Sequence, residues 1–330
     1  MKTRSPARSE RSAVKPGRRR SVEVRVPAST ANLGAGFDCF GLALELYLTV
    51  RATVQSEPGS HPHVRSRGEP GSSLLPRTPE ENLVFRAMSH TADREGLRLP
   101  CVRLAVHNAI PLASGLGSSA AAIVAGVALA FAVGDRPVSE EAALRFAAEL
   151  EGHADNVAAA LLGGLVATCV REDGSVAAIR RRWPNDIRVV AVTPNFTLET
   201  AKARAALPKT VDRADAVHNL QRSALLIAAL EERRYDLIWD ALQDRLHQPH
   251  RQSLIPGLAD ILRMPRTDGL LGLALSGAGP SVVALATDDF DKIGKAIAGH
   301  FERKGLTTTV RCLAVAEKGA VFTQKTTAGR

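Results

Sequence analysis

The sequence is poor in aromatic residues and in cysteine. Aromatic residues make up only 4% of the 330 residues, which leaves little of the basic and aromatic interleaving that is typical of surfaces for single-stranded nucleic acids. The cysteines are few, far apart and without a C-x-x-C motif: Cys39, Cys101, Cys169 and Cys312. This spacing disfavours a disulfide framework or a zinc site and favours a thiol-reducing cytoplasm.

Long apolar runs are also missing. The longest, residues 120–133, has 14 residues and contains Gly126, which is too short to span a bilayer. Residues 1–20 have no hydrophobic stretch of the kind found in secretory signals. We therefore expect a cytoplasmic protein without a membrane segment.

The positive charge is concentrated at one end of the chain. The net charge is +9, but residues 1–20 hold eight basic residues and a single acid, Glu10. The other 310 residues carry only +2, so the folded body is not expected to bind nucleic acid. Residues 1–20 are rich in Arg, Ser and Pro, which predicts a disordered basic tail; a targeting peptide is the competing interpretation. Such a tail would give at most non-specific, salt-dependent binding to nucleic acid.

The first half of the chain shows both strand and helix periodicity. Alternating valines predict a strand from residue 21, and residues 42–54 are predicted to be extended as well. Residues 56–79 are rich in Gly, Pro, Ser and His, which predicts a surface loop. Residues 118–133 are apolar on every face, which predicts a helix buried inside the domain.

The second half continues the mixture of helices and strands. Helices are predicted at residues 218–234 and 235–247, and strands at 270–276 and 281–286 around a glycine-rich turn. The polar stretch 171–186 is the predicted domain boundary. We expect a disordered tail and two domains, over residues 1–20, 21–175 and 185–325.

A glycine-rich segment at residues 111–121 (PLASGLGSSAA) follows a predicted strand and opens the buried helix. Backbone N–H groups free of side chains, together with the helix dipole, favour an anion such as a polyphosphate at this point. The alternative is an ordinary strand-to-helix turn in which Ser118 and Ser119 cap the helix.

Two known nucleotide motifs do not account for this segment. No G-x-x-x-x-G-K-[ST] sequence occurs in the chain, so the segment is not a Walker A loop. It matches G-x-G-x-x-A, with Asp135 about 20 residues further on. A dinucleotide fold would need a second strand ending at that acid, but a helix is predicted to start there instead.

Two further glycine-rich segments lie between predicted strands, at residues 27–38 (PASTANLGAGFD) and 275–281 (LSGAGPS). Either one alone is equally well explained as a structural turn. Three such segments at these positions in one chain are a much more specific signal.

Together the three segments resemble the motifs of the GHMP kinases. Within that superfamily the chain is similar to the homoserine kinases, from about Val22 to its C-terminal region. The stretches that carry the resemblance are 29–38 (STANLGAGFD), 151–156 (EGHADN), 218–220 (HNL) and 244–251 (DRLHQPHR). The resemblance implies an α+β fold with an N-terminal domain like ribosomal protein S5 and a ferredoxin-like C-terminal domain.

The resemblance also implies an activity. Homoserine kinases use Mg-ATP to phosphorylate the side-chain hydroxyl of L-homoserine, which gives O-phospho-L-homoserine on the route to threonine. The expected partners are therefore ATP, Mg²⁺ and L-homoserine, and a homodimer is expected from the family.

ATP-binding and metal-binding residues follow from the matching motifs. Ser119 and Glu151 would bind Mg²⁺, which at kinase sites takes one or two protein oxygens besides phosphates and water; Glu149 is the alternative to Glu151. Asn82 matches the adenine-contacting segment, although an asparagine near a helix start also serves as a cap. The expected ATP-binding residues are Asn82, Pro111, Ser114, Gly115, Leu116, Gly117, Ser118, Ser119, Ala120 and Ala121.

The amino-acid substrate needs a cation for its carboxylate and an acceptor for its ammonium group. Arg204 and Arg251 match the family's carboxylate-binding arginines, and a guanidinium is suited to a carboxylate by its two-pronged geometry. Asp38 is the candidate for the ammonium group and Asn32 for the hydroxyl. The other expected substrate-binding or catalytic residues are His153, Asp155, Asn156, Thr200 and Gly277. The resemblance to homoserine kinases implies no dedicated base; mevalonate kinase-like relatives use an aspartate positioned by a lysine, and the first segment here has no lysine to position Asp155.

Two rival functions have different signatures. A GHMP kinase for mevalonate or a sugar would need no ammonium site, and the two arginines together with residues 151–156 argue against it. A catalytically idle fold that binds nucleic acid through its tail would lose that affinity, but no kinase activity, when residues 1–20 are deleted.

Overall fold

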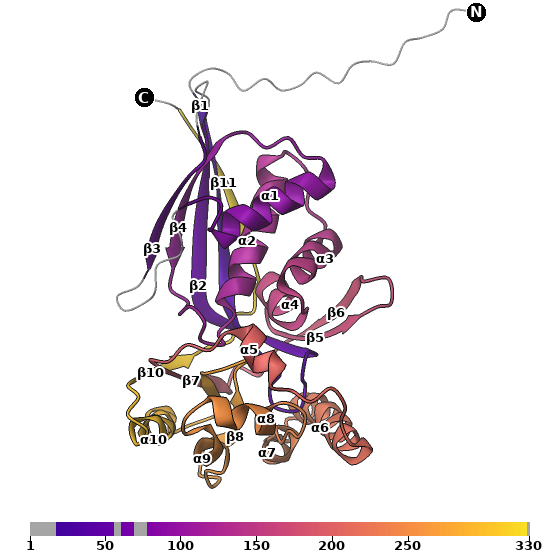
Figure 1. The fold of residues 1–330 in the computed structure, drawn as a ribbon, viewed down its shortest axis with the longest axis vertical. Helices are drawn as coiled ribbons and strands as arrows, with labels where there is room; N and C mark the ends of the chain where they lie inside the picture. The colour runs from indigo at the N-terminus through magenta and orange to yellow at the C-terminus, as the bar shows by residue number, and fades with distance from the viewer. Residues whose placement is uncertain (1–17, 56–60, 69–77, 329–330) are drawn as a thin grey trace, which may run out of the picture.

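The chain folds around two β-sheets, one above the other in Figure 1. A computed structural model describes residues 18–55, 61–68 and 78–328. Most of the predicted basic tail, residues 1–17, lies outside this range. Residues 18–20 do not belong to a tail, because they form the start of the first strand.

The larger sheet has seven strands within the described residues, in the order β11-β1-β2-β4-β3, with β5 paired to β2 and β6 paired to β5. β3 runs parallel to β4, and the other pairs are antiparallel. Their bounds are β1 Arg18–Ala31, β2 Phe40–Val54, β3 His63–Gly68, β4 Val102–Asn108, β5 Leu165–Val170, β6 Val176–Arg181 and β11 Val321–Ala328.

The helices α1 to α4 lie on one face of this sheet (Figure 1), with α2 and α4 packed directly on β1 and β2. α2 is buried nearly all round, as its apolar sequence predicts, because it packs on β1 and β2 while α1, α3 and α4 cover its other sides. Their bounds are α1 Leu83–Glu95, α2 Ser118–Val133, α3 Glu140–Glu151 and α4 Asp155–Leu162.

The smaller sheet is antiparallel, with the strand order β10-β7-β9-β8. Its strands are β7 Arg188–Pro194, β8 Leu270–Leu275, β9 Val282–Ala286 and β10 Thr308–Leu313. The helices of this half are α5 Thr200–Ala205, α6 Arg213–Glu231, α7 Ile238–Ala241, α8 Gln248–Arg251, α9 Leu258–Leu262 and α10 Phe290–Glu302. α10 packs on β7 and β10, and its buried Ile293, Ile297 and Phe301 help to form a second hydrophobic core.

Two described strands cross the predicted division into residues 21–175 and 185–325. β6 lies inside the polar stretch 171–186 and extends the larger sheet by pairing with β5. β11 returns from the end of the chain and pairs antiparallel with β1. By strand pairing, the larger sheet therefore extends to Arg181 and also takes in the last described segment.

Two element predictions were wrong. The predicted loop at residues 56–79 contains β3, which pairs with β4 although its sequence is mostly polar. The predicted helix at residues 235–247 is reduced to a 3₁₀ turn (Tyr235–Leu237) and the short α7. The reason is Asp244, whose side chain accepts the backbone N–H groups of Leu246, His247 and Gln248 and so folds this stretch into a turn.

Candidate active site

A cavity of about 350 Å³ lies where the three glycine-rich segments meet. It is also lined by the end of α3, the start of α4, the segment before α5, and α5 and α8. The predicted site residues that line it are Asn32, Asp38, Ser114, Gly115, Gly117, Ser118, Ser119, Glu151, His153, Asp155, Asn156, Thr200, Arg204, Arg251 and Gly277. The fold therefore gathers most of the predicted site into one space.

The middle glycine-rich segment opens α2 with glycines that no other residue could replace without strain. Gly115 and Gly117 have φ values of 83° and 69°. A Cβ at Gly115 would lie 2.3 Å from the backbone oxygen of Ser276, and one at Gly117 would lie 2.1 Å from Ser29 Oγ. These close approaches lock the segment against the first and third glycine-rich segments.

The start of α2 is suited to an anion. Its N-cap residue is Gly117, and among the described residues no side chain caps the helix, so Ser118 and Ser119 do not fill the capping role. The first N–H groups of a helix have no partner within the helix and carry partial positive charge. At the edge of a cavity they can donate hydrogen bonds to a phosphate group.

Beside this helix start, Glu151 and Ser119 bring together two side-chain oxygens of the kind that bind a metal ion. Ser119 Oγ donates to Glu151 Oε1 over 2.5 Å. Burial raises the pKa of the Glu151 carboxyl, and Asp155 adds to the rise, whereas the Ser119 hydrogen bond and His153 oppose it. A divalent cation would relieve the cost of burying this carboxylate, so the two side chains fit the predicted Mg²⁺ site.

Glu149, the alternative metal ligand, faces elsewhere. Its carboxylate lies 3.5 Å from Arg94 Nη2 and 3.8 Å from His90 Nε2, and it does not line the cavity. Among the described residues, no cluster of three or more His, Cys, Asp or Glu side chains could hold a metal. A site completed by substrate phosphates needs no such cluster.

Asp155 anchors a polar cluster at the start of α4. Its Oδ1 accepts a hydrogen bond from the backbone N–H of Asn156 over 2.6 Å and lies 2.7 Å from His153 Nδ1. Burial opposes the charged form of His153, but the hydrogen bond and charge of Asp155, with Glu151, outweigh burial and raise the His153 pKa. Asn156 Oδ1 in turn accepts from Ser29 Oγ over 2.8 Å, which ties α4 to β1.

Asn32 links the first and third glycine-rich segments. Its Nδ2 donates to the backbone oxygen of Gly277 over 3.0 Å, and its Oδ1 accepts the N–H of Asp38, also over 3.0 Å. Ser276 Oγ donates to the backbone oxygen of Gly115 over 2.7 Å. All three segments are therefore joined by hydrogen bonds around the cavity.

Three charged side chains that line the cavity, Asp38, Arg204 and Arg251, lie close to one another. Arg204 donates to both carboxylate oxygens of Asp38, over 2.8 and 2.9 Å. Arg251 is almost fully buried, and burial together with the nearby Arg204 lowers its pKa to about 10, which still leaves it charged at neutral pH. The ring of Phe37 lies near both guanidinium groups, 5.7 Å from that of Arg204 and 5.5 Å from that of Arg251.

Some predicted ATP-binding residues do not line the cavity. The side chain of Asn82 is buried and caps α1, with Oδ1 accepting the N–H groups of Val84 and Phe85; its neighbour Leu83 lines the cavity instead. The others shape the loop or pack in the core: Pro111, Leu116, Ala120 and Ala121.

Other cavity residues were missed from the sequence. Phe37 could have been found, because it is the aromatic residue directly before Asp38 in the first segment. Leu112 and Ala113 lie within the glycine-rich segment at residues 111–121, whereas no sequence signal marks the apolar side chains of Ala122 and Leu198 at the cavity wall. Such residues become part of a site only through the packing of distant segments.

Comparisons with known proteins place the chain in a class. The family model for the GHMP kinases N terminal domain matches residues 82–164, and the one for the GHMP kinases C terminal region matches residues 226–303. Mevalonate diphosphate decarboxylase from Staphylococcus aureus, which is 14% identical, matches with a TM-score of 0.65 over 92% of this chain and 98% of its own, a likeness of fold alone. The predicted α+β GHMP kinase fold is therefore confirmed.

More similar proteins define the family within this class. Homoserine kinase from Moorella thermoacetica is 42% identical over 90% of this chain and 98% of its own length. Homoserine kinase from Deinococcus radiodurans is 46% identical over 80% and 84%, respectively. The crystal structure of homoserine kinase from Cytophaga hutchinsonii matches with a TM-score of 0.80 at 30% identity, over 92% of this chain and 97% of that one. The chain belongs to the homoserine kinase family.

Proposed function

We propose that this protein transfers the terminal phosphoryl group of ATP to the side-chain hydroxyl of L-homoserine, a step on the route to threonine. The observation that carries the proposal is the arrangement of one cavity. Its lining combines the uncapped start of α2 and the glycine-rich loop with the charged side chains of Asp38, Arg204 and Arg251. A phosphate donor and a zwitterionic amino acid are the ligands that these two sets of groups fit.

The phosphate end of the site would act through charge and position. The glycine-rich loop and the first N–H groups of α2 would bind the phosphates of ATP. Ser119 Oγ and Glu151 would hold Mg²⁺, which supplies neutralising charge to the phosphates when bound. Phosphoryl transfer has a loose transition state, so positioning and charge neutralisation account for most of the rate.

The substrate end of the site would orient the amino acid. Arg204 and Arg251 would bind the carboxylate and Asp38 the ammonium group, which directs the hydroxyl toward Asn32 and the phosphate end. Asp155 Oδ1 is held by His153 Nδ1 and by the N–H and Nδ2 of Asn156, and the first glycine-rich segment has no lysine that could position this carboxylate as a base. We therefore assign Asp155 to positioning rather than to proton removal.

The setting of the reaction is part of the proposal. No helix in the described part of the chain is long and apolar enough to cross a membrane, and all four cysteines are free thiols. Free thiols and the use of ATP support a cytoplasmic location. The homodimer expected from the family stays a prediction, which light scattering at several protein concentrations would test.

The test is ADP release from Mg-ATP with L-homoserine, L-threonine, mevalonate and galactose at equal concentrations. Turnover that depends on homoserine, with O-phosphohomoserine identified by mass spectrometry, is the expected result. Turnover with mevalonate or galactose alone would contradict the assigned substrate. A Ser119→Ala, Glu151→Gln double variant, which should lose turnover, controls for contaminating kinases.

A further inference from the structure

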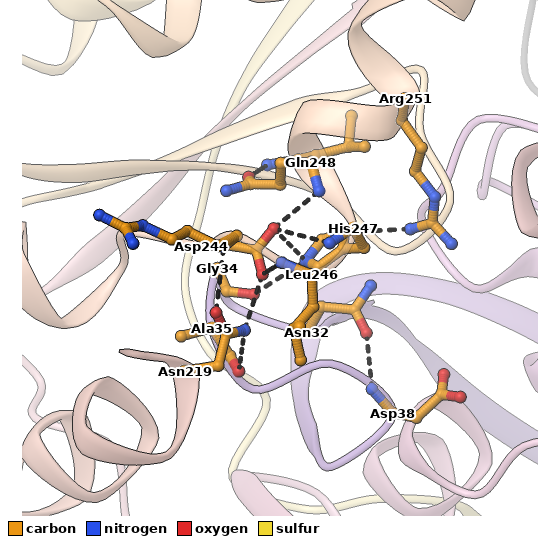
Figure 2. A network of polar contacts seen from close by, with 12 residues as sticks. Asn32, Gly34, Ala35, Asp38, Asn219, Asp244, Leu246, His247, Gln248 and Arg251 are labelled. Carbon is orange, nitrogen blue, oxygen red and sulfur yellow. Dashed lines mark hydrogen bonds and ion pairs between the residues drawn. The ribbon is translucent and has the colours of Figure 1, made fainter. Parts of the chain in front are cut away.

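His247 lies buried between Arg251 and the first glycine-rich segment (Figure 2). Its Nε2 is 2.8 Å from the backbone oxygen of Gly34, and its Nδ1 is 3.1 Å from Arg251 Nη1. The ring also stacks on Phe37, with 5.2 Å between the ring centroids. His247 does not line the cavity, so any effect on the substrate must pass through its neighbours.

The partners of His247 determine where its proton lies. A guanidinium has only donors, so the contact with Arg251 requires Nδ1 to accept and to carry no hydrogen. A carbonyl oxygen can only accept hydrogen bonds, so Nε2 must carry the hydrogen that it donates to the backbone oxygen of Gly34. His247 is therefore the neutral Nε2–H tautomer. The charged groups that face the ring are Asp244, whose Oδ2 lies 3.5 Å from Nε2, Arg251 and Asp38, and burial is the largest cause that lowers the pKa of His247.

His247 and Gly277 together fix the orientation of Arg251. Arg251 Nη1 meets His247 Nδ1 and donates to the backbone oxygen of Gly277 over 3.0 Å, so both of its hydrogens are used. Nε donates to the backbone oxygen of Ala203 over 3.3 Å. Within the described residues, Nη2 is left as the guanidinium nitrogen for a ligand in the cavity.

We propose that His247 is a positioning residue that turns Arg251 Nη2 toward the substrate carboxylate and ties Arg251 to the loop bearing Asn32 and Asp38. This inference rests on the proposed function, because it assumes that Arg251 meets the carboxylate of homoserine. The tie is direct: Gly34, which accepts from His247, lies two residues after Asn32 and four before Asp38.

The surroundings of His247 are built to hold the ring still. Asp244 accepts the backbone N–H of His247 over 3.0 Å and is itself fixed by Asn219 Nδ2 over 2.7 Å (Figure 2). Gly34 also lies directly against the segment that follows α7, because a Cβ at Gly34 would lie 2.0 Å from the backbone oxygen of Leu242. This contact between loop and turn holds the acceptor of His247 in place.

Two substitutions separate the two ring nitrogens. In His247→Asn, the side-chain oxygen replaces the Nδ1 acceptor, while the donor to Gly34 is lost. In His247→Gln, the terminal NH₂ replaces the Nε2 donor, while the acceptor for Arg251 is lost. Asparagine is the smaller of the two and removes more packing against Phe37, so a purely structural role would make His247→Asn the worse variant.

The proposal predicts the opposite order. His247→Gln should raise the KM for homoserine about tenfold, the effect of losing one hydrogen bond to a charged group, with kcat and the KM for ATP within about twofold. His247→Asn should stay within about threefold of the original protein. With 3-amino-1-propanol, which is homoserine without its carboxylate, the original protein and His247→Gln should have the same kcat/KM.

The outcomes distinguish this inference from the proposed function. An original protein without homoserine-dependent turnover would refute both. An active original protein with His247→Asn as impaired as His247→Gln, or with neither impaired, would refute the positioning role alone. Nitrogen-15 spectra of the histidine rings in the original protein give a check that needs no variant, and an Nδ1–H tautomer or a protonated ring for His247 would overturn the inference.

Discussion

Arg204 and Asp38 face each other in a two-bond ion pair, with Nη1–Oδ2 and Nη2–Oδ1 distances of 2.8 and 2.9 Å. Arg204 comes from α5 and Asp38 from the loop before β2, so the pair joins the two halves of the chain. A zwitterionic substrate offers each of them the opposite charge. In the proposed function, homoserine would therefore replace one ion pair by two, with its carboxylate on Arg204 and its ammonium group on Asp38.

We expect Arg204→Met to lower kcat/KM for homoserine about 100-fold, because truncating one partner of a charged hydrogen-bonded contact costs a few kcal/mol. The KM for ATP should change less than about threefold, since we assign Arg204 to the amino-acid substrate and not to ATP. Arg263→Met is a matched control, because Arg263 is an exposed arginine that pairs with Asp260. Steady-state kinetics with each substrate varied in turn would check this, and a loss below threefold for Arg204→Met would contradict it.

Three carboxylate substitutions test the metal site. Glu151→Gln should lower kcat by about 100-fold or more and raise the Mg²⁺ concentration needed for half-maximal rate, because a charged ligand becomes neutral. Asp155→Asn should lose less activity. Glu149→Gln, on the same helix but outside the cavity, should stay near the original rate. A loss of several thousandfold in Asp155→Asn, with a milder one in Glu151→Gln, would reverse the assigned roles.

The buried Glu151 carboxyl should also affect stability. Its pKa in the folded protein is raised above the ordinary 4.5, mainly by burial, so between the unfolded and folded pKa values the folded state binds more protons. Stability therefore falls as pH rises through that window and stays reduced above it. We expect Glu151→Gln to raise the unfolding temperature near neutral pH, without Mg²⁺ or ATP, and to lose this advantage in acid. Calorimetry at several pH values would check this, with Glu149→Gln as control; an unfolding temperature equal to or below the original at neutral pH would be evidence against it.

The N-terminal boundary can be tested by two deletions. Removing residues 1–17 should leave kinase activity within about twofold and abolish any salt-dependent binding to DNA. Removing residues 1–20 also deletes Arg20, which donates to Asp135 and to the backbone oxygen of Ala132, each over 2.6 Å. The longer deletion should therefore lower the unfolding temperature. Equal unfolding temperatures for both would show that Arg20 contributes nothing measurable.

Local sequence patterns predicted some elements well and others not. The apolar stretch at residues 118–133 predicted α2 with its observed bounds, because an all-apolar helix of this length has only one stable place, the core. β3 was missed because it is a polar strand whose pairing with β4 is a tertiary event. The helix predicted at residues 235–247 failed because Asp244 competes for its backbone N–H groups.

The candidate site shows the same division. Glycine-rich segments and motif resemblance predicted most of the residues that the cavity brings together. The contacts between them could not be predicted, because they join residues far apart in sequence, as Asn32 and Gly277 do. From the sequence, Asn82 could either contact adenine or cap a helix. The structure shows that it caps α1, because its side chain accepts the backbone N–H groups of Val84 and Phe85.

The pairing of β11 with β1 has a consequence for how the protein is made. β1 ends at Ala31 and β11 begins at Val321, so the ribosome must add nearly 290 residues before β1 can meet its partner. At about 5–20 residues per second this wait is on the order of 15 to 60 s. During that time one edge of β1 is open to pairing with other chains. β11, the last described strand, has eight residues and covers the open edge of β1. A nascent chain released before β11 is made would keep this edge of β1 unpaired and prone to aggregation.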